Sequence, residues 1–298
     1  MKPPKISVVL TTYNRAHLLG RTIECIQAQT VGDFELIICD DVSEDHTESV
    51  CRAYQKLDPR IRYLKGARNA GMPGNLNAGI RACSAEYVAN LHDGDLYEPT
   101  LLERWAEALD QFPNAAFVFN AYRDIDSAGQ TKQVCKEPLG PCQPGSVVLE
   151  RLFFRRWLLN SPVWGTVMAR RSAYLAANLF DPRFGFIADV DMWLRLAEQF
   201  DIAYVPEPLI IRASREAVPR IWNGAERLTQ RYVRRMFWES RLRHYKGSPV
   251  RLLAEVVRHG AFVAASEGWR AACSANRIRR SLWNSVSKSS LKQTVQTK

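Results

Sequence analysis

The 298-residue chain lacks three features that would assign it to a class at once. No window reaches eighteen uninterrupted apolar residues, and the apolar stretch at residues 6–10 is too short for a signal peptide or a membrane span. The seven cysteines form neither a CxxC pair nor a zinc-binding spacing, which is typical of a reducing compartment. The phosphate-binding patterns GxxxxGKS/T and GxGxxG are also missing. We therefore expect a cytoplasmic protein whose cysteines are small buried residues.

Acidic residues are scarce at the C-terminal end, and this asymmetry explains the net charge of +10. From Arg212 onward there are 19 Lys+Arg against 5 Asp+Glu, whereas residues 1–211 carry 22 against 26. A uniformly basic surface would indicate nucleic acid, but an acidic front with a basic end indicates a catalytic unit held near an anionic surface. We predict a catalytic domain over residues 1–212 and a basic helical region over 213–298.

The basic region also interleaves aromatic residues with arginines, and three explanations stay open. In decreasing order of preference, these residues pack the C-terminal helices, lie on the inner face of an anionic membrane, or bind single-stranded nucleic acid. Nucleic acid is thus the least favoured partner. The aromatic residues are Trp222, Tyr232, Trp238, Tyr245 and Trp269.

Short β-branched runs alternate with helical patterns over the first 125 residues, which predicts βαβ units and a mainly parallel central sheet with helices on both faces. The predicted strands are 5–12, 34–40, 61–65, 86–92 and 115–122, and the predicted helices are 15–29, 43–57, 73–83 and 99–111. The segment 126–146 is rich in Gly, Pro and Ser and is predicted to be a long surface loop or hairpin. A strand at 163–170, a helix at 189–199 and a strand near 201–206 follow.

Two aspartates separated by one glycine, in "HDGD", follow the fourth predicted strand. Residues two apart in an extended chain point to one side, so Asp93 and Asp95 are expected to lie together. Such a pair favours a divalent cation, and Mg²⁺ or Mn²⁺ takes one or two protein carboxylates and fills its shell with water and phosphate. The pair therefore indicates a metal completed by a diphosphate. For this motif alone, a turn at the end of a strand is the simpler explanation.

Other polar residues follow the neighbouring predicted strands, whose carboxyl ends are expected to meet at one rim of the sheet. Asp40 and Asp41 end the second strand, where a carboxylate can accept hydrogen bonds from a nucleobase or a ribose hydroxyl. Arg68 lies in the Gly-rich segment 66–82, where it is available to a phosphate.

A later helix is predicted to begin at about Asp189, because an apolar stripe starts there. Asp189 is the better candidate for a general base. Asp191 lies about 200° around the helix from it and four residues before Arg195, the spacing of a surface ion pair. The stripe consists of Val190, Trp193, Leu194 and Ala197.

In this order, the motifs resemble those of the family 2 glycosyltransferases, which are inverting enzymes with the GT-A fold. "ISVVLTTYNR", "LIICDDVSED", "ARNAGMPGNLNAGIRA", "YVANLHDGD" and "DVDMWLRL" carry the resemblance, which covers residues 4–212. It implies that the protein transfers a sugar from a nucleoside diphosphate sugar, of the UDP type, to a saccharide or lipid-linked saccharide acceptor. Cell-surface polysaccharide or glycolipid synthesis is the implied setting.

The resemblance also implies roles for single residues. Thr11, Tyr13 and Arg15 would line the nucleotide site, to which Arg68 adds a cation, and Asp41 would recognise the base. Asp93 would approach the ribose or the metal-bound water, Asp95 would bind the cation (Mn²⁺ or Mg²⁺) and Asp189 would be the catalytic base. The secondary candidates are Asp40, Asp191 and Arg195.

Three positions depart from the family pattern. Leu96 stands where a further acidic residue is usual, Ala188 where Glu usually precedes the base, and Ser214 where a His is expected. Low activity or an unusual donor is the expected consequence.

Three alternatives remain. A sugar nucleotidyltransferase of similar fold would need a Gly-rich phosphate loop after the first strand, but the chain has "TTYNRAH". A phosphatase with a nucleophilic aspartate would need Thr or Val in place of Tyr97. A nucleic-acid-binding protein that acts through its basic end is the alternative from another class.

Overall fold

A computed structural model shows the fold and describes residues 3–150, 163, 165–213, 236, 238–254 and 256–257. The strands are β1 (Ile6–Thr12), β2 (Phe34–Asp40), β3 (Ile61–Lys65), β4 (Tyr87–His92), β5 (Asp95–Tyr97), β6 (Ala115–Ile125), β7 (Thr131–Cys135), β8 (Cys142–Gln143), β9 (Val167–Arg170) and β10 (Asp201–Ala213). The helices are α1 (Ala16–Gln27), α2 (Thr47–Leu57), α3 (Gly71–Ala82), α4 (Leu101–Gln111), α5 (Gly145–Val148), α6 (Arg171–Ala176), the 3₁₀ helix η2 (Pro182–Ile187) and α7 (Ala188–Ala197).

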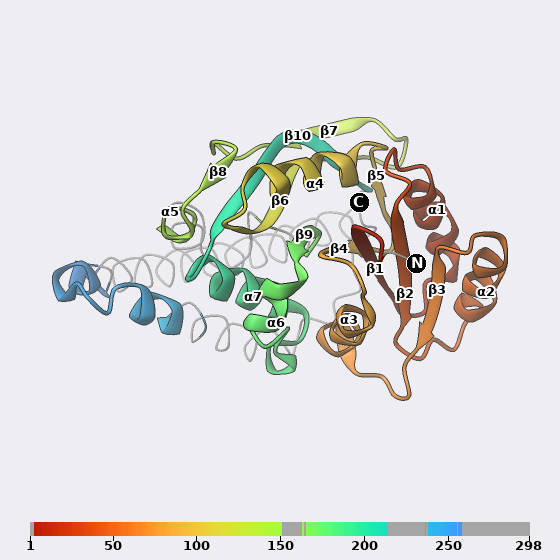
Figure 1. Cartoon of the computed structure of the whole chain (residues 1–298), viewed down its shortest axis with the longest axis horizontal. Helices are drawn as coiled ribbons and strands as arrows, with labels where there is room; N and C mark the ends of the chain where they lie inside the picture. Colours follow the sequence, from red (N-terminus) through yellow and green to blue (C-terminus); the bar gives the residue numbers. More distant parts are fainter. Residues whose placement is uncertain are drawn as a thin grey trace, which may run out of the picture. The chain divides into compact units, whose positions relative to one another are not determined.

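One sheet connects all ten of these strands in the order β3-β2-β1-β4-β9-β6-β10-β5, with β7 beside β6 and β8 beside β10 (Figure 1). The first four strands in this order are parallel, as the alternation of strands and helices predicts. Strand β9 runs antiparallel between β4 and β6, while β6 and β10 are parallel to each other. The α/β class and the helices on the sheet are therefore confirmed, and the second half of the sheet is mixed.

Helices cover both faces of the sheet, which is why β1 and β2 are apolar along almost their whole length. Alternate residues of β1 (Ile6, Val8 and Leu10) belong to the same buried cluster as α1 and α4 residues such as Ile23 and Trp105. The opposite side of β1 faces α3, where a Cβ on Gly79 would come within 2.5 Å of the Val9 side chain. Strands covered on both faces read as continuous apolar runs.

Several boundaries differ from the prediction. Strand β9 begins at Val167 and not at residue 163, and β10 continues to Ala213, beyond the predicted 201–206. The second helix begins at Thr47 and not at residue 43, because Ser43 is used in the preceding turn: its hydroxyl donates to Asp40 and accepts from the Asn14 N–H. The segment 126–146 contains β7, β8 and the start of α5 in addition to loops, so the hairpin alternative was the better one. Its short strands lack an apolar period because β7 is mostly exposed.

The chain divides into two compact units, Met1–Ser240 and Arg241–Lys298. The predicted boundary between 212 and 213 stays a prediction, because residues 214–235, with Ser214, Trp222 and Tyr232, lie outside the described residues. Trp269 also lies outside them. The six described cysteines are free thiols.

Candidate active site

The carboxyl ends of β1 and β2 form part of one rim of the sheet. The strand register places Thr12 beside Asp40. The next residue, Asp41, donates its N–H to the Thr12 carbonyl at 3.1 Å, and its Oδ1 accepts from the Ala70 N–H at 2.7 Å. The loop after β3, which also carries Arg68, is thereby tied to the rim.

Asp40 is buried and its carboxylate is fully engaged within the protein. Its Oδ1 accepts from the N–H and the hydroxyl of Ser43 at 2.8 and 2.6 Å, and its Oδ2 accepts from the Tyr63 hydroxyl. These bonds support the turn after β2, in which Val42 has a left-handed φ of 65°. Asp40 is therefore better explained as a support of this turn than as a ligand-binding residue.

The prediction that Asp93 and Asp95 point to one side of an extended strand is wrong. Gly94 has a φ of 88°, a conformation that glycine adopts without strain, and the chain turns there from β4 into β5. The Thr22 hydroxyl accepts from the Gly94 N–H at 3.1 Å and donates to the Asp95 carbonyl at 3.3 Å. The two aspartates therefore flank a tight turn that α1 holds in place.

Asp93 contacts the Arg15 side chain. Its Oδ1 accepts from the Arg15 guanidinium at 3.5 Å, and its side chain is 11% exposed. Burial raises the pKa of Asp93, while Arg15, Thr12 and His92 act in the opposite direction. The Thr12 hydroxyl is close enough to Asp93 to lower its pKa, but neither this hydroxyl nor Asp93 Oδ2 has a hydrogen bond of normal geometry in the described part of the chain. Two such atoms mark a place where a ligand oxygen, water or cation fits.

A divalent cation fits the chemistry of this turn. Asp95 opens β5 and is 7% exposed, and Mg²⁺ and Mn²⁺ need only one or two protein carboxylates. Within the described residues, no group of three or more His, Cys, Asp or Glu is arranged to hold a metal. A cation bound here would therefore depend on oxygens of a ligand to complete its shell.

Asp189 lies in the first turn of α7, which begins at Ala188, one residue from the predicted start. Its Oδ1 accepts from the Val190 N–H at 2.8 Å. A Cβ on Gly165 would be 3.4 Å from Asp189 Oδ2 and 2.6 Å from Nε2 of His92, the last residue of β4. Burial raises the pKa of Asp189 to about 7. The carboxyl group is therefore near the rim with a pKa suited to proton transfer at neutral pH.

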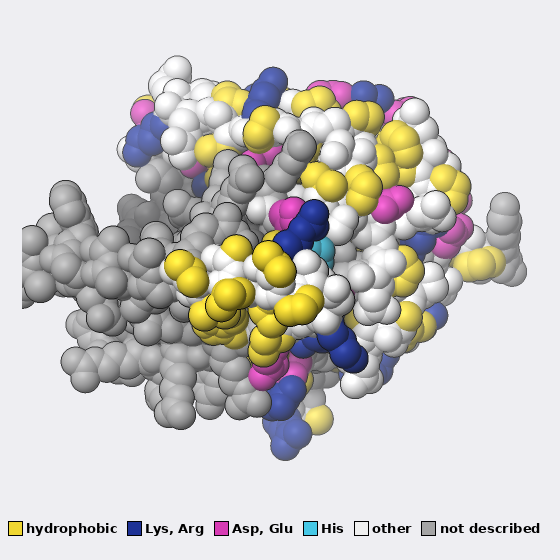
Figure 2. All heavy atoms as spheres, turned by 90° about the vertical axis from the view of Figure 1, so that its left-hand side faces the viewer, with side chains coloured by type: hydrophobic (Ala, Val, Ile, Leu, Met, Phe, Trp, Pro, Cys, Tyr) yellow, Lys and Arg dark blue, Asp and Glu magenta, His cyan; other side chains and the backbone are white. Residues whose placement is uncertain are grey.

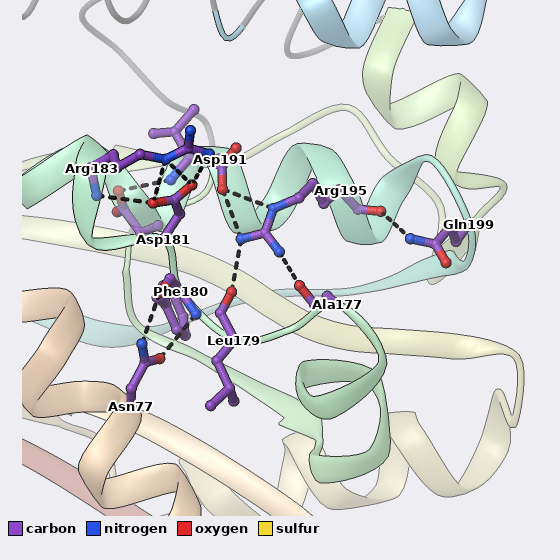
Figure 3. A network of polar contacts seen from close by, with 11 residues as sticks. Asn77, Ala177, Leu179, Phe180, Asp181, Arg183, Asp191, Arg195 and Gln199 are labelled. Carbon is purple, nitrogen blue, oxygen red and sulfur yellow. Dashed lines mark hydrogen bonds and ion pairs between the residues drawn. The ribbon is translucent and has the colours of Figure 1, made fainter.

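Asp191 and Arg195 form the predicted ion pair, but not at the surface. The Arg195 Nε donates to Asp191 Oδ2 at 2.8 Å, and the two side chains are only 22% and 9% exposed. The same guanidinium donates to the carbonyls of Ala177 and Leu179 (Figure 3). The pair thus joins α7 to the segment that follows α6, and its role is structural.

The remaining predicted nucleotide-site residues lie at the rim with free surface. Tyr13 follows β1 and is 47% exposed, Thr11 is half-buried beside His92 in the β1–β4 register, and Arg68 is exposed. The ends of β1, β2 and β4 thus lie at one rim of the sheet. Asp189 of α7 comes close to this rim at Gly165. The nucleotide roles of these residues stay predictions.

Three residues at this place had no predicted role: Thr12, His92 and Gly165. Thr12 and His92 end apolar strands, and the same strand-end signal that selected Asp41 applies to them. No sequence pattern points to Gly165, because it is close to His92 and Asp189 in space but far from both along the chain.

Two of the three positions that depart from the family pattern are buried in the structure. Leu96 is 8% exposed in β5 opposite Ile211, and Ala188 is fully buried at the start of α7. A carboxylate at either position would be buried at a cost in free energy.

A cavity of about 580 Å³ lies at the end of the sheet opposite this rim, where β6 and β10 begin. Its lining includes Asn114, Arg170 and Asp201 and none of the candidate residues. It is separate from the rim.

The solved structures that are similar to this chain include two with a bound nucleotide or nucleotide sugar. TarS of S. aureus (residues 1–349, in complex with UDP) has a TM-score of 0.63 and 16% identity, over 80% of this chain and 65% of that one, so this chain spans slightly less than two thirds of it. The mannosyltransferase PcManGT from Pyrobaculum calidifontis, in complex with GDP-Man and Mn²⁺, has a TM-score of 0.55 and 15% identity, over 91% of this chain and 83% of that one. These likenesses show the GT-A fold.

Comparisons of sequence, and above all the match to a family model, give the family. The GalNAc(5)-diNAcBac-PP-undecaprenol beta-1,3-glucosyltransferase of Campylobacter jejuni is 44% identical over 93 residues, which are 31% of this chain and 30% of that protein. The family description "Glycosyl transferase family 2" matches residues 7–175, more than half of the chain. The chain therefore belongs to glycosyl transferase family 2.

Proposed function

We propose that this protein is an inverting glycosyltransferase that moves a sugar from a nucleoside diphosphate sugar to an acceptor hydroxyl, in the synthesis of a cell-surface polysaccharide or glycolipid. The observation that carries the proposal is that His92, from the end of β4, and Asp189, from α7, both approach Gly165. This arrangement brings a carboxyl group with a pKa of about 7 to the strand ends where Asp41 and Asp93 lie.

The reaction is a single in-line displacement. Asp189 takes the proton of the acceptor hydroxyl, whose oxygen forms a bond to the anomeric carbon from the face opposite the diphosphate. The bond from that carbon to the diphosphate breaks, so the configuration inverts and a nucleoside diphosphate leaves. When bound, a divalent cation supplies Lewis-acid stabilisation of the leaving diphosphate, and Asp95 is the residue that we propose to hold it, with Asp93 beside it.

The residues at the rim receive the donor. Thr11, Tyr13 and Arg15 line the nucleotide site, Asp41 accepts hydrogen bonds from the base, and Arg68 reaches a phosphate. Bound UDP in TarS supports a UDP-type donor, and GDP-Man with Mn²⁺ in PcManGT supports the nucleoside diphosphate and the cation. The Campylobacter relative is named for a substrate linked to undecaprenol, which supports a lipid-linked saccharide as acceptor.

The test is a screen of nucleotide sugars for binding and hydrolysis, with Mn²⁺ and with EDTA. We expect one donor, of the UDP type, to bind with Mn²⁺ and to lose at least tenfold in affinity with EDTA. The variant D95N should behave in Mn²⁺ as the wild type does in EDTA, because it removes the proposed cation ligand. No response of the wild type to any donor would refute the glycosyltransferase activity, and full Mn²⁺ dependence in D95N would remove Asp95 from the metal role.

We also propose that the C-terminal unit binds an anionic membrane surface. Residues 241–298 contain twelve Lys and Arg but only two Glu. Residues 249–254 are helical and, with the residues after them, expose apolar side chains: Val250, Leu253 and Val257 are 79%, 64% and 64% exposed. Figure 2 shows hydrophobic side chains gathered on the face that it presents, with Lys and Arg beside them. Exposed apolar residues next to cations fit the interface of an anionic bilayer.

No helix in the described part of the chain has the length and hydropathy to span a bilayer. The surface proposal is tested by flotation with liposomes. Vesicles with 30% anionic lipid should carry the protein upward at low salt, whereas neutral vesicles should not. The double variant V250D/L253D should lose about tenfold in vesicle affinity without a change in thermal stability, since both residues are exposed. Equal flotation of the variant, or retention on oligonucleotides in preference to vesicles, would contradict this proposal.

A further inference from the structure

His92 is half-buried, and two hydrogen bonds hold its backbone in place. The buried Tyr97 hydroxyl accepts from the His92 N–H at 2.9 Å and donates to the His92 carbonyl at 2.8 Å. On its other side, His92 is beside Thr11 in the β1–β4 register. The imidazole therefore projects from an anchored strand end, directly before Asp93.

The His92 imidazole and the Asp189 carboxyl group face the same small space. A Cβ on Gly165 would lie 2.6 Å from His92 Nε2 and 3.4 Å from Asp189 Oδ2, so these two atoms are no more than about 6 Å apart. A Cβ that comes within 3 Å of another heavy atom requires that atom to move, so a side chain at position 165 would occupy the space between them. Asp189 Oδ1 is taken by the Val190 N–H, and Oδ2 is the oxygen that faces Gly165.

The distance suits one hydroxyl group. An oxygen that hydrogen-bonds a carboxylate and an imidazole N–H spans up to about 5.6 Å between them. The hydroxyl donates its proton to the carboxylate, which only accepts, and accepts from the Nε2–H of a neutral imidazole.

We propose that His92, Gly165 and Asp189 form a cradle for the acceptor hydroxyl, in which His92 donates a hydrogen bond to the oxygen that attacks. This inference rests on the proposed transfer reaction. The proton of the hydroxyl passes to Asp189, the oxygen forms its bond to the anomeric carbon, and the diphosphate takes the electron pair of the bond that breaks. His92 keeps its proton throughout and orients a lone pair of the attacking oxygen toward that carbon.

The test compares H92L, H92Q and G165A, with the donor found in the screen and with UDP and GDP as binding probes in Mn²⁺. We expect H92L to lower kcat about 10²-fold, the cost of one lost donor in an active site, while the donor KM and the affinity for the nucleoside diphosphate change less than twofold. H92Q should regain at least tenfold over H92L, because its amide N–H still donates. G165A should lower kcat as H92L does, since its methyl group fills the cradle.

Thermal unfolding of each variant separates these effects from misfolding. A kcat of H92L within twofold of the wild type overturns the cradle and leaves the transferase proposal intact. A fall in nucleotide affinity equal to the fall in kcat also overturns it, because His92 would then serve the donor. A wild type that binds neither UDP nor GDP overturns the proposed function and the cradle with it.

Discussion

Replacing Asp189 by Asn is expected to lower kcat by about 10³-fold, because the general base is lost and such groups contribute 10²–10⁴-fold. Nucleotide affinity should stay within about twofold, since Asp189 belongs to α7 and not to the strand ends that we assign to the donor. The Asn side-chain oxygen retains the bond from the Val190 N–H, so the start of α7 is preserved. Steady-state kinetics and calorimetric titration with UDP and Mn²⁺ measure the two quantities. A near-normal turnover would remove Asp189 from the role.

The pH dependence provides an independent check of the same residue. Because burial raises the pKa of Asp189 to about 7, the carboxylate is lost below that pH, so kcat/KM of the wild type should rise with pH and level off about one unit above 7. An unfolded Asp has a pKa of about 3.9. Between about pH 4 and 7 the folded protein therefore binds more protons than the unfolded chain, and the free energy of unfolding falls as pH rises. D189N should lack this part of the slope and be the more stable protein at pH 8.

Replacing Arg195 by Met is expected to lower the free energy of unfolding by about 3 kcal/mol, the size found when one partner of a buried ion pair is removed. The change leaves Asp191 buried without its cation and the carbonyls of Ala177 and Leu179 without their donor. Leu179 and its neighbour Asn178 have left-handed φ values of 61° and 59°, which Arg195 helps to hold. Urea denaturation of R195M against the wild type measures the loss.

A matched control lies nearby. Arg183 pairs with Asp181 at 2.6 Å, but its side chain is 79% exposed (Figure 3). R183M removes the same charge and should cost less than about 1 kcal/mol, because exposed pairs contribute little. Equal losses in both variants would mean that burial of the Asp191–Arg195 pair is not what stabilises α7.

Sequence periodicity located most of the elements that build the rim. The apolar runs of β1, β2 and β4 matched their strands to within a residue, and the stripe after Asp189 placed the start of α7 to within one residue. These signals are local, because a strand or helix that packs on a core shows its own period in the sequence. The helix at 43–57 was predicted to begin four residues too early, because Ser43 looks like a helix cap in the sequence. In the structure its hydroxyl donates to Asp40 within the turn before the helix.

The sequence by itself determined the α/β class, the order of the motifs and the resemblance to family 2, because these depend on residues close to one another along the chain. Only the tertiary structure showed that the chain makes a tight turn at Gly94, between Asp93 and Asp95. It also showed that the Asp191–Arg195 pair is largely buried. It alone brought His92 to Asp189 across Gly165. Such contacts join residues up to about a hundred positions apart, and burial and distance between them follow from how the sheet and α7 pack.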